Sequence, residues 1–450
     1  MDYQYGFTTK IKNNILFKKG LNLKVIKKIS EIKKEPKWMF DFRLQAYKNF
    51  LKLKNPNWGI DISFIDFNDY IYFASALKNE ANDKIPDEIK ETFNKLGIDE
   101  KEQQILSGIN EQFDSQTVFH ELIKEIKQKK IIFCGFDEAI QKHGEIVKKY
   151  LGKLVNSSDN KYAALNSCVC SGGSFLYVPK NTILDKPLQS YFRINTKSLG
   201  QFERTLIIIE EGCQVHYIEG CTAPVYDKNN LHAAVVEVFI NQNSKFRYST
   251  IQNWSKNVLN LVTKRAILEK NSFIEWVDGN VGSLINMKYP CSILKGDNSN
   301  AKCISIATCN KNMKQDTGAK MIHLGKNTRS QIISKTISSD NGISNFRGLV
   351  KITKNAINSF SSIECDTLLL DQTSSSDTIP KEIVENNSSF IKHEAKISNI
   401  DKELLFYLNS KGFDEKKAKQ LFSLGFIKPF TDLLPLEYAV ELNRLLKEII

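Results

Sequence analysis

The sequence predicts an α+β protein in which a central parallel β-helix, or β-solenoid, is flanked by an N-terminal and a C-terminal helical domain. The first observation is a repeat in the middle of the chain, where turns bearing Asn or Gly each precede an alternating, strand-like segment. The turns lie at Gly212, Asn243, Asn271, Asn298, Asn327 and Asn355, at intervals of 31, 28, 27, 29 and 28 residues. A period of this size indicates stacked repeats that bury their apolar faces against one another.

The second observation is that helical spacing almost disappears from Asn166 to about Leu370. Short segments rich in β-branched and aromatic residues replace it, such as SFLYVP, RTLIIIEE, AAVVEVFI and KFRYSTIQ. Asn and Gly suit the corners between them because both tolerate a left-handed backbone. A β-helix fits this pattern best, and an ordinary β-sandwich is the structural alternative.

Helical spacing dominates residues 1–160. One helix is expected over 21–36, where it ends at Pro36, and a second over 40–54. A third is expected over 136–152, with Asp137 as its N-cap and Gly152 at its end.

The segment 386–450 returns to helical spacing. A helix is expected to begin at Asn399 or Asp401 and to end at Gly412. A second follows with Asp414 as its cap, and a third opens at Pro435. The predicted domains are therefore 1–160, 161–385 and 386–450, and the apolar faces of the last helices suit mutual packing or a docked partner.

Composition narrows the class of protein. With 450 residues, 41% hydrophobic and 25% charged, the chain is long enough for two or three folded domains. A net charge of +12 favours anionic partners, but Lys, Asn and Ile are abundant throughout, so a nucleic-acid function rests on charge alone. Nine dilute cysteines indicate a reducing compartment. The sequence has no signal core and no run of 18 apolar residues, so we expect no transmembrane segment.

Two cysteines lie where they could do chemistry. Cys221, in EGCTAP, is expected in a tight, exposed turn, where a thiolate could accept sulfur or bind a metal; a buried structural thiol fits equally well. Cys365, in IECDTLLL, is placed by strand alternation on the face opposite Glu364 and Asp366.

A third segment, IKHEAKIS, contains His393 and Glu394, whose side chains point to opposite sides if the segment is a strand. A Cys, a His and a carboxylate from adjoining strands would form a mixed ligand set for iron. The chain has no Cys-x-x-Cys pair, which argues against a permanent four-cysteine cluster. A site with fewer thiols would hold a cluster loosely enough to pass it on.

Long motifs in these regions carry a family resemblance. The motifs are EGCTAP, LHAAVVEVFI, STIQNW, LVTKRA, KYPCSILKGDNS, DTGAKMIHLGKNTRSQIISK, NFRGLV, ECDTLLL, KHEAKIS and LLFYLNSKGFDEKKA. In order and spacing the chain resembles the SufB family, the iron–sulfur cluster assembly scaffold of the Suf system. The resemblance covers most of the chain and is strongest from about residue 166 to the C-terminus.

The resemblance implies a right-handed β-helix and a set of partners. These are the SufC ATPase, docked on the C-terminal helical domain, and the SufD paralogue or a second copy of the chain. Sulfur would arrive as persulfide from a cysteine desulfurase and its relay protein, and the nascent cluster would pass to apo iron–sulfur proteins. The chain would be a scaffold and not an enzyme, with weak intrinsic ATPase activity left open and a flavin possible in the assembled complex.

The resemblance also assigns roles to residues. Cys221 would receive or relay sulfur, and Cys365 would be the main cluster-building thiol, with His393 and Glu394 near it. The sulfur path would be lined by Arg193, Asn195, Gln252, Trp254 and Lys264. Cations such as Arg193 and Lys264 would stabilise anionic persulfide sulfur and lower the pKa of neighbouring thiols.

One position departs from the family pattern. Relatives usually carry an acidic residue where this chain has Lys392, so the ligand set beside Cys365 stays open between Glu394, His393 and a partner residue.

Three further expectations concern an alternative function, one motif and the cell compartment. A β-helix enzyme that processes polysaccharides through clustered carboxylates is the alternative function, although no dense carboxylate cluster lies along one strand. LGKNTRS around Gly325 lacks the phosphate-loop core and is interpreted as a turn. The Lys/Asn/Ile bias, the missing targeting segment and the SufB resemblance together predict a plastid, possibly a reduced one such as an apicoplast.

Overall fold

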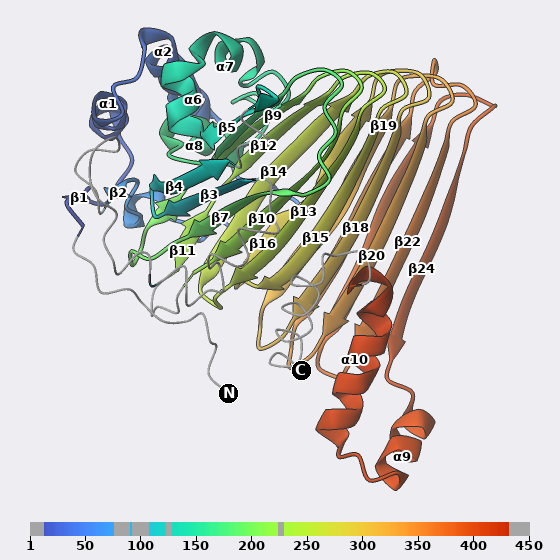
Figure 1. Cartoon of the computed structure of the whole chain (residues 1–450). Helices are drawn as coiled ribbons and strands as arrows, with labels where there is room; N and C mark the ends of the chain where they lie inside the picture. The colour runs from blue at the N-terminus through green and yellow to red at the C-terminus, as the bar shows by residue number, and fades with distance from the viewer. Residues whose placement is uncertain (1–12, 76–90, 92–107, 123–127, 224–228, 432–450) are drawn as a thin grey trace.

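The chain forms a parallel β-solenoid with helices at both ends (Figure 1). The computed structural model describes residues 13–75, 91, 108–122, 128–223 and 229–431. Each coil gives one strand to each of two sheets, and a strand pairs in parallel with the strand one coil away. Lys245 lies opposite Phe273, for example, which lies opposite Asn300. This pairing confirms the predicted solenoid and excludes the β-sandwich alternative, whose neighbouring strands would run antiparallel.

The first sheet contains the strands that carry most of the candidate residues. In spatial order its strands are β24 (Phe390–Asn399), β22 (Phe360–Leu369), β20 (Arg329–Ser338), β18 (Asn300–Cys309), β15 (Phe273–Gly282), β13 (Lys245–Trp254), β10 (Gln214–Thr222), β7 (Leu188–Arg193), β3 (Gly108–Phe113) and β4 (Gln116–Leu122).

The second sheet faces the first across the interior. Its main path is β23 (Ser375–Val384), β21 (Ile343–Ile352), β19 (Lys314–His323), β16 (Ile285–Lys288), β14 (Val258–Leu268), β12 (Val235–Ile240), β9 (Arg204–Ile209), β6 (Ser174–Val178) and β5 (Ile132–Gly135); the short strands β8 (Gly200–Gln201), β11 (Asn230–His232) and β17 (Cys291–Leu294) complete it.

The predicted corners hold the left-handed conformation at five of the six positions. Gly212, Asn243, Asn271, Asn298 and Asn327 all have positive φ, and each lies two residues before a strand of the first sheet. At the sixth corner this conformation belongs to Asn358 and not to Asn355, because Asn358 holds the position two residues before β22. The corner side chains also bond to one another: Asn271 donates to Asn243 and Asn298 donates to Asn271, both at 3.0 Å.

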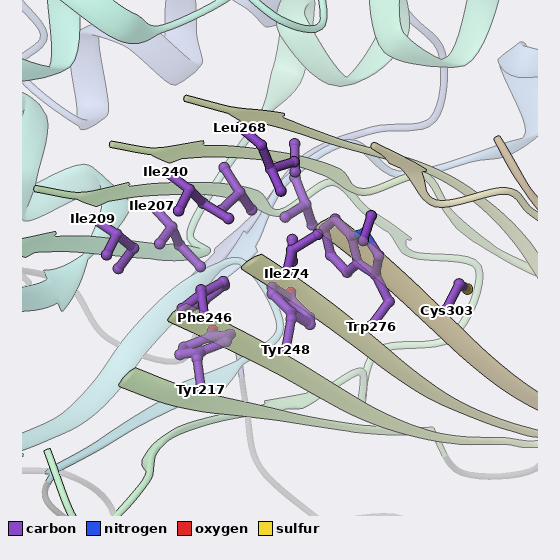
Figure 2. Packing of buried hydrophobic residues seen from close by; sticks show 14 of the residues in the cluster. Ile207, Ile209, Tyr217, Ile240, Phe246, Tyr248, Leu268, Ile274, Trp276 and Cys303 are labelled. Carbon is purple, nitrogen blue, oxygen red and sulfur yellow. The ribbon is translucent and has the colours of Figure 1, made fainter. Parts of the chain in front are cut away.

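The apolar core fills the half of the interior nearest these corners. Figure 2 shows Tyr217, Phe246, Tyr248 and Trp276 of the first sheet packed opposite isoleucine and leucine side chains of the second. Further along the same strands the inward side chains become polar. The interior is therefore divided along its width into an apolar half and a polar half, and the latter contains Cys221.

The N-terminal helices cover one end of the solenoid (Figure 1). They are α1 (Leu23–Ile32), α2 (Lys37–Lys52), α6 (Phe136–Lys142), α7 (Gly144–Tyr150) and α8 (Lys161–Val169), with a 3₁₀ turn at Phe67–Asp69 and a small sheet of β1 (Ile15–Leu16) and β2 (Ala74–Ser75). Residues 1–160 also give β3, β4 and β5 to the main sheets, so this predicted domain shares the β-structure of the solenoid.

The helix expected over 136–152 is two helices that meet at His143. Asp137 does not cap it, because Gly135 occupies the N-cap position and the Asp137 carboxylate is buried. That carboxylate pairs with Lys33 and accepts a hydrogen bond from the backbone N–H of Gly172 at 2.9 Å. Asp137 thus connects α1, α6 and the solenoid instead of one helix end.

At the other end the solenoid continues beyond the predicted boundary at residue 385. That boundary falls between β23 and β24, and the helices begin only with α9 (Lys402–Ser410) and α10 (Glu415–Thr431). The predicted caps are confirmed: Asp401 accepts from Glu403 N–H and Asp414 from Lys417 N–H. The helix expected from Pro435 lies outside the described residues. Within the described ranges, no helix combines the length and apolarity that crossing a membrane requires.

Candidate functional site

Cys221 lies near the end of β10 with its side chain inside the solenoid. It is 1% exposed, and its register partners are Phe192 on one side and Gln252 on the other. The expected exposed turn is therefore wrong. Strand pairing continues through Thr222, so coils on both sides cover the thiol.

The surroundings of Cys221 raise the pKa of its thiol. Burial is the largest cause, and Glu219 and Glu203 raise the pKa further, whereas Lys264 and Lys288 oppose them. The lowering of the thiol pKa that we expected from a nearby lysine is thus outweighed by burial and by the two carboxylates. Because exchange needs a thiolate, Cys221 must lose its proton as part of any sulfur transfer.

A buried cluster of charges surrounds this thiol. Three carboxylates, from Glu203, Glu219 and Asp278, and three basic side chains, from His232, Lys264 and Lys288, are all at most 5% exposed. Such charges are stable inside a protein only when they are paired.

The pairs within the cluster are direct. Lys288 Nζ lies 3.2 Å and Lys264 Nζ 3.5 Å from Asp278 Oδ1, and His232 Nε2 lies 2.7 Å from Glu203 Oε2. Burial lowers the pKa of Lys288 to about 8. The pKa of Asp278 is lowered despite its burial, because the two lysines outweigh the loss of solvation.

Three of the five residues expected on the sulfur path share the interior with Cys221. Gln252 and Trp254 lie on β13, the strand next to that of Cys221, and Lys264 lies on β14 of the opposite sheet. Lys264 Nζ donates to Thr250 at 2.6 Å and lies 4.0 Å from Glu219. The side-chain donors Gln252 Nε2 and Trp254 Nε1 are buried and have no acceptor among the described residues.

The other two residues lie elsewhere. Arg193 is fully buried, but its Nη1 donates to Thr222 Oγ1 at 3.1 Å on the face of the sheet opposite Cys221. Asn195 follows the end of β7, and its backbone N–H donates to Asp114 at 2.6 Å. The structure therefore does not bring Arg193 and Asn195 together with the thiol.

Cys365 also faces the interior, and it lies on the face opposite Glu364 and Asp366, as alternation predicted. Strand register places it at the end of a row of inward side chains, one per coil, which we call the Cys365 row. The row consists of Glu219, Thr250, Asp278, Ser305, Ser334 and Cys365. Each member is at most 5% exposed.

The Cys365 row extends through the coils that separate the two candidate thiols. Cys221 lies two residues after Glu219 on the same strand and so belongs to the adjacent inward row. Five strand spacings separate β10 from β22, which corresponds to about 24 Å. The thiols thus share one interior but are too far apart for direct exchange.

At the far end, Cys365 contacts a histidine. Its Sγ lies 3.6 Å from His393 Nε2 and 3.9 Å from Thr378 Oγ1. His393 Nδ1 in turn lies 2.7 Å from Glu382 Oε1 of β23. The Glu382 carboxylate accepts the Nδ1 proton and orients the ring, which turns Nε2 toward Cys365. Burial raises the pKa of the Cys365 thiol.

Glu394 is not part of this group. It pairs in register with Glu364 on the outer face, one position beyond inward-facing His393, and it is exposed. The nearby carboxylate is instead that of Glu382, which no sequence motif singles out. Lys392 is exposed on the same outer face as Glu394.

The other cysteines and the buried carboxylates are also enclosed by the solenoid or by the helices. All nine cysteines are reduced and buried, and no group of three or more Cys, His, Asp or Glu in the described ranges has metal-site geometry. The carboxylates of the interior cluster are enclosed, which gives a polysaccharide no access to them. Gly325 lies at the corner between β19 and β20, as the interpretation of LGKNTRS as a turn predicted.

Comparisons with known proteins place this arrangement in a family. The family described as "SUF system FeS cluster assembly, SufBD core domain" matches residues 192–426, and "SufBD protein N-terminal region" matches 30–190. The chain belongs to the SufBD family. An iron–sulfur cluster assembly SufBD family protein of Staphylococcus aureus is 50% identical over 448 residues, which span 99% of this chain and 96% of the relative. A Staphylococcus epidermidis member is 49% identical over the same length.

The family match confirms the resemblance and corrects one expectation. The SufBD core match spans both Cys221 and Cys365, and the N-terminal match ends just before the sulfur-path residues. These SufBD relatives are bacterial, and they give no support to the expected plastid or apicoplast. Lys/Asn/Ile bias reports base composition, which plastids share with many bacteria.

Proposed function

We propose that this SufBD protein is a scaffold that accepts sulfur at Cys221 and builds a nascent iron–sulfur cluster at Cys365. The supporting observation is that both thiols face one solenoid interior and that the Cys365 row extends from Glu219, two residues before Cys221, to Cys365. A polar, enclosed row can hold anionic sulfur away from water and oxidants, whereas an apolar one would exclude it.

The sulfur step is an exchange between thiols. The Cys221 thiolate attacks the terminal sulfur of a donor persulfide, R–S–SH. The donor S–S bond breaks, a new S–S bond forms on Cys221, and the donor leaves as the thiolate R–S⁻. The donor would be a cysteine desulfurase or its relay protein. Lys264 and Lys288 favour the anionic form of the transferred sulfur and partly offset the opposing effects of burial, Glu219 and Glu203.

Iron is the second substrate, and Cys365 with His393 supplies its donors. A thiolate and an imidazole nitrogen are ligands that iron accepts, and two protein donors leave positions for sulfide and for a partner's residue. His393 is only partly buried, so the site lies near the open end of the solenoid. A completed cluster could leave there for an apo-protein.

The partners would occupy two surfaces at this end. Leu404 and Leu408 of α9 and Phe422 of α10 line an apolar groove of about 440 Å³, which suits a SufC ATPase. The last coil, β23 and β24, suits the SufD paralogue or a second copy. ATP hydrolysis belongs to SufC in this scheme. A flavin, if present, belongs to the assembled complex, and the proposal gives it no residues of this chain.

The experiment compares two single variants with a matched control. Cys365→Ala should abolish cluster formation from iron and a sulfur donor, measured anaerobically by iron and sulfide per chain, while the partner complex still assembles. Cys221→Ala should reduce persulfide loading more than iron binding. Cys303→Ala, an equally buried thiol within the apolar core, should match the wild type. Normal clusters in Cys365→Ala would reject the proposal.

A further inference from the structure

A line of polar side chains crosses four coils on the inner face of the second sheet. His232 of β11, Asn260 of β14, Asn286 of β16 and Gln315 of β19 occupy successive positions in register, and we call them the amide line. All are at most 1% exposed. His232 lies in the motif LHAAVVEVFI, whereas Asn260, Asn286 and Gln315 lie outside the quoted motifs, and none of the four belongs to the expected sulfur path.

The hydrogen bonds along the amide line run in one direction. Gln315 Nε2 donates to the backbone carbonyl of Gly282 at 2.6 Å, and a carbonyl can only accept. Gln315 therefore turns its Oε1 to Asn286 Nδ2 at 2.8 Å. Asn286 turns its Oδ1 to Asn260 Nδ2 at 2.7 Å. Asn260 Oδ1 then faces His232 Nδ1 at 2.6 Å, and Nδ1 must carry a hydrogen.

The other ring nitrogen of His232 also faces an acceptor. Nε2 lies 2.7 Å from Glu203 Oε2, so both ring nitrogens donate and the ring is an imidazolium. His232 is then one of three basic side chains that lie beside three carboxyl groups in the buried cluster. Burial opposes this charge, but Glu203 and the two hydrogen bonds raise the pKa of His232.

The amide line fixes two side chains beside Cys221. Asn260 Nδ2 also donates to Gln252 Oε1 at 2.8 Å, and Lys288 approaches the same oxygen at 3.2 Å. With its oxygen held, Gln252 presents its unpartnered Nε2 in another direction. The His232 ring packs on Trp254 with centroids 4.7 Å apart, and the indole Nε1 is likewise unpartnered.

Two buried N–H groups without acceptors are costly, and the cost is recovered when an anion binds. Gln252 is the register partner of Cys221, and Trp254 packs in the same cluster as that thiol. We propose that His232, Glu203 and the amide line are positioning residues that aim the donors of Gln252 and Trp254 at a sulfur anion, a perthiolate on Cys221 or hydrosulfide. The role toward sulfur rests on the proposed function.

Nuclear magnetic resonance of the full chain tests the direction of the line. The chain has six histidines, so ¹⁵N-histidine labelling is tractable, and His232→Gln assigns the signal. We expect both ring nitrogens of His232 to be protonated at pH 8. Gln315→Met removes the anchor and should lower the doubly protonated fraction. A neutral His232 in the wild type, or no change in Gln315→Met, overturns the proposal.

Sulfur loading provides the second readout, with inorganic polysulfide as donor and mass spectrometry of alkylated Cys221 as the assay. Gln315→Met and His232→Gln should retain about tenfold less persulfide, the effect of misaligning one hydrogen bond to a charged acceptor. Ser344→Ala is the matched control, because Ser344 is the register partner of Gln315 on the next coil and lies beyond the end of the amide line. Thermal unfolding confirms that each variant folds.

Ring protonation and sulfur loading together distinguish a failure of the positioning role from a failure of the proposed function. Equal loading in Gln315→Met and the wild type overturns the positioning role. A wild type that takes no sulfur at Cys221 rejects the sulfur role in the proposed function, and the ring protonation then decides the amide line on its own.

Discussion

Glu382 differs from the other residues near Cys365 because it touches the imidazole and not the thiol. Its carboxylate holds Nδ1–H of His393 at 2.7 Å, which fixes the ring and leaves Nε2 facing Cys365. Carboxylates that orient a ligating histidine in this way typically contribute 10- to 100-fold to metal affinity. Strand alternation explains why Glu394, next to His393 in sequence, has no such contact.

We therefore predict that Glu382→Ala weakens ferrous iron binding about tenfold or more. Isothermal titration under anaerobic conditions, with Glu394→Ala as control, measures it. The control should change iron affinity by less than twofold, because Glu394 lies on the outer face. A larger loss in Glu394→Ala than in Glu382→Ala would contradict the geometry.

The reactivity of Cys221 depends on the charges beside it. Glu219 raises the pKa of the thiol and Lys264 lowers it, on top of a large increase from burial. Removing the negative charge should lower the pKa and enlarge the thiolate fraction at a given pH, and removing the positive charge should do the opposite.

The predicted order of alkylation rates at pH 8 is accordingly Glu219→Gln fastest, wild type next and Lys264→Met slowest, with several-fold steps. Mass spectrometry of iodoacetamide-treated protein gives the rates. All three proteins should react faster as pH rises toward the thiol pKa. The reverse order would mean that access, and not charge, controls the thiol.

At the scale of elements, the corners of the solenoid combine a backbone constraint with a side-chain ladder. Asn271 has a φ of 55° and bonds to the asparagines of both neighbouring corners. Glycine would keep the backbone but lose the ladder, whereas valine would lose both, since a β-branched residue resists the left-handed region.

We expect Asn271→Gly to cost about 1 kcal/mol and Asn271→Val about 1–2 kcal/mol more. The unfolding midpoint in urea measures the order. Asn355→Val is the control, because Asn355 does not have a positive φ, and it should cost less than Asn271→Val. Equal losses at both positions would show that the left-handed corner is not the cause.

The elements show why part of the molecule was predictable. Corner spacing and alternation are local and repeat, so the solenoid, the inward Cys365 and the caps at Asp401 and Asp414 follow from short windows of sequence. The residues that cover a strand, in contrast, come from distant parts of the sequence. Cys221 looked exposed because its motif resembles a turn, whereas pairing with distant coils buries it.

The site residues that were missed have the same explanation. Glu382 lies on the second sheet and contacts His393 on the first, and no sequence motif contains both residues. The amide line did leave a signal, since His232, Asn260, Asn286 and Gln315 are spaced by 28, 26 and 29 residues, close to the corner period. Polar residues that recur at the repeat period can thus be read as an interior row.

At the scale of the whole molecule, the two ends of the solenoid differ in how they are covered. N-terminal helices cover one end, whereas β23 and β24 are the outermost strands at the other end in the described part of the chain (Figure 1). This last coil exposes apolar side chains, including Ile379, Val384, Phe390 and Ile397. Unpaired strand edges with apolar side chains favour addition of another chain.

We predict that Val384→Lys with Ile397→Lys disrupts association with the SufD paralogue, or with a second copy, by at least tenfold in Kd. Two desolvated charges at an interface centre have a cost of this size or larger. Light scattering of the mixed proteins gives the mass of the complex. Leu51→Lys, at an exposed apolar position on α2 at the covered end, is the control.

The result also bears on the cluster site, because Cys365 and His393 lie in the last coils. If the partner completes the ligand set, the double variant should lose cluster yield in the presence of the partner and should keep the persulfide on Cys221, which lies about 24 Å away. Unchanged association in the double variant would mean that the open coil is not the interface, and the missing ligands would then have to come from this chain alone.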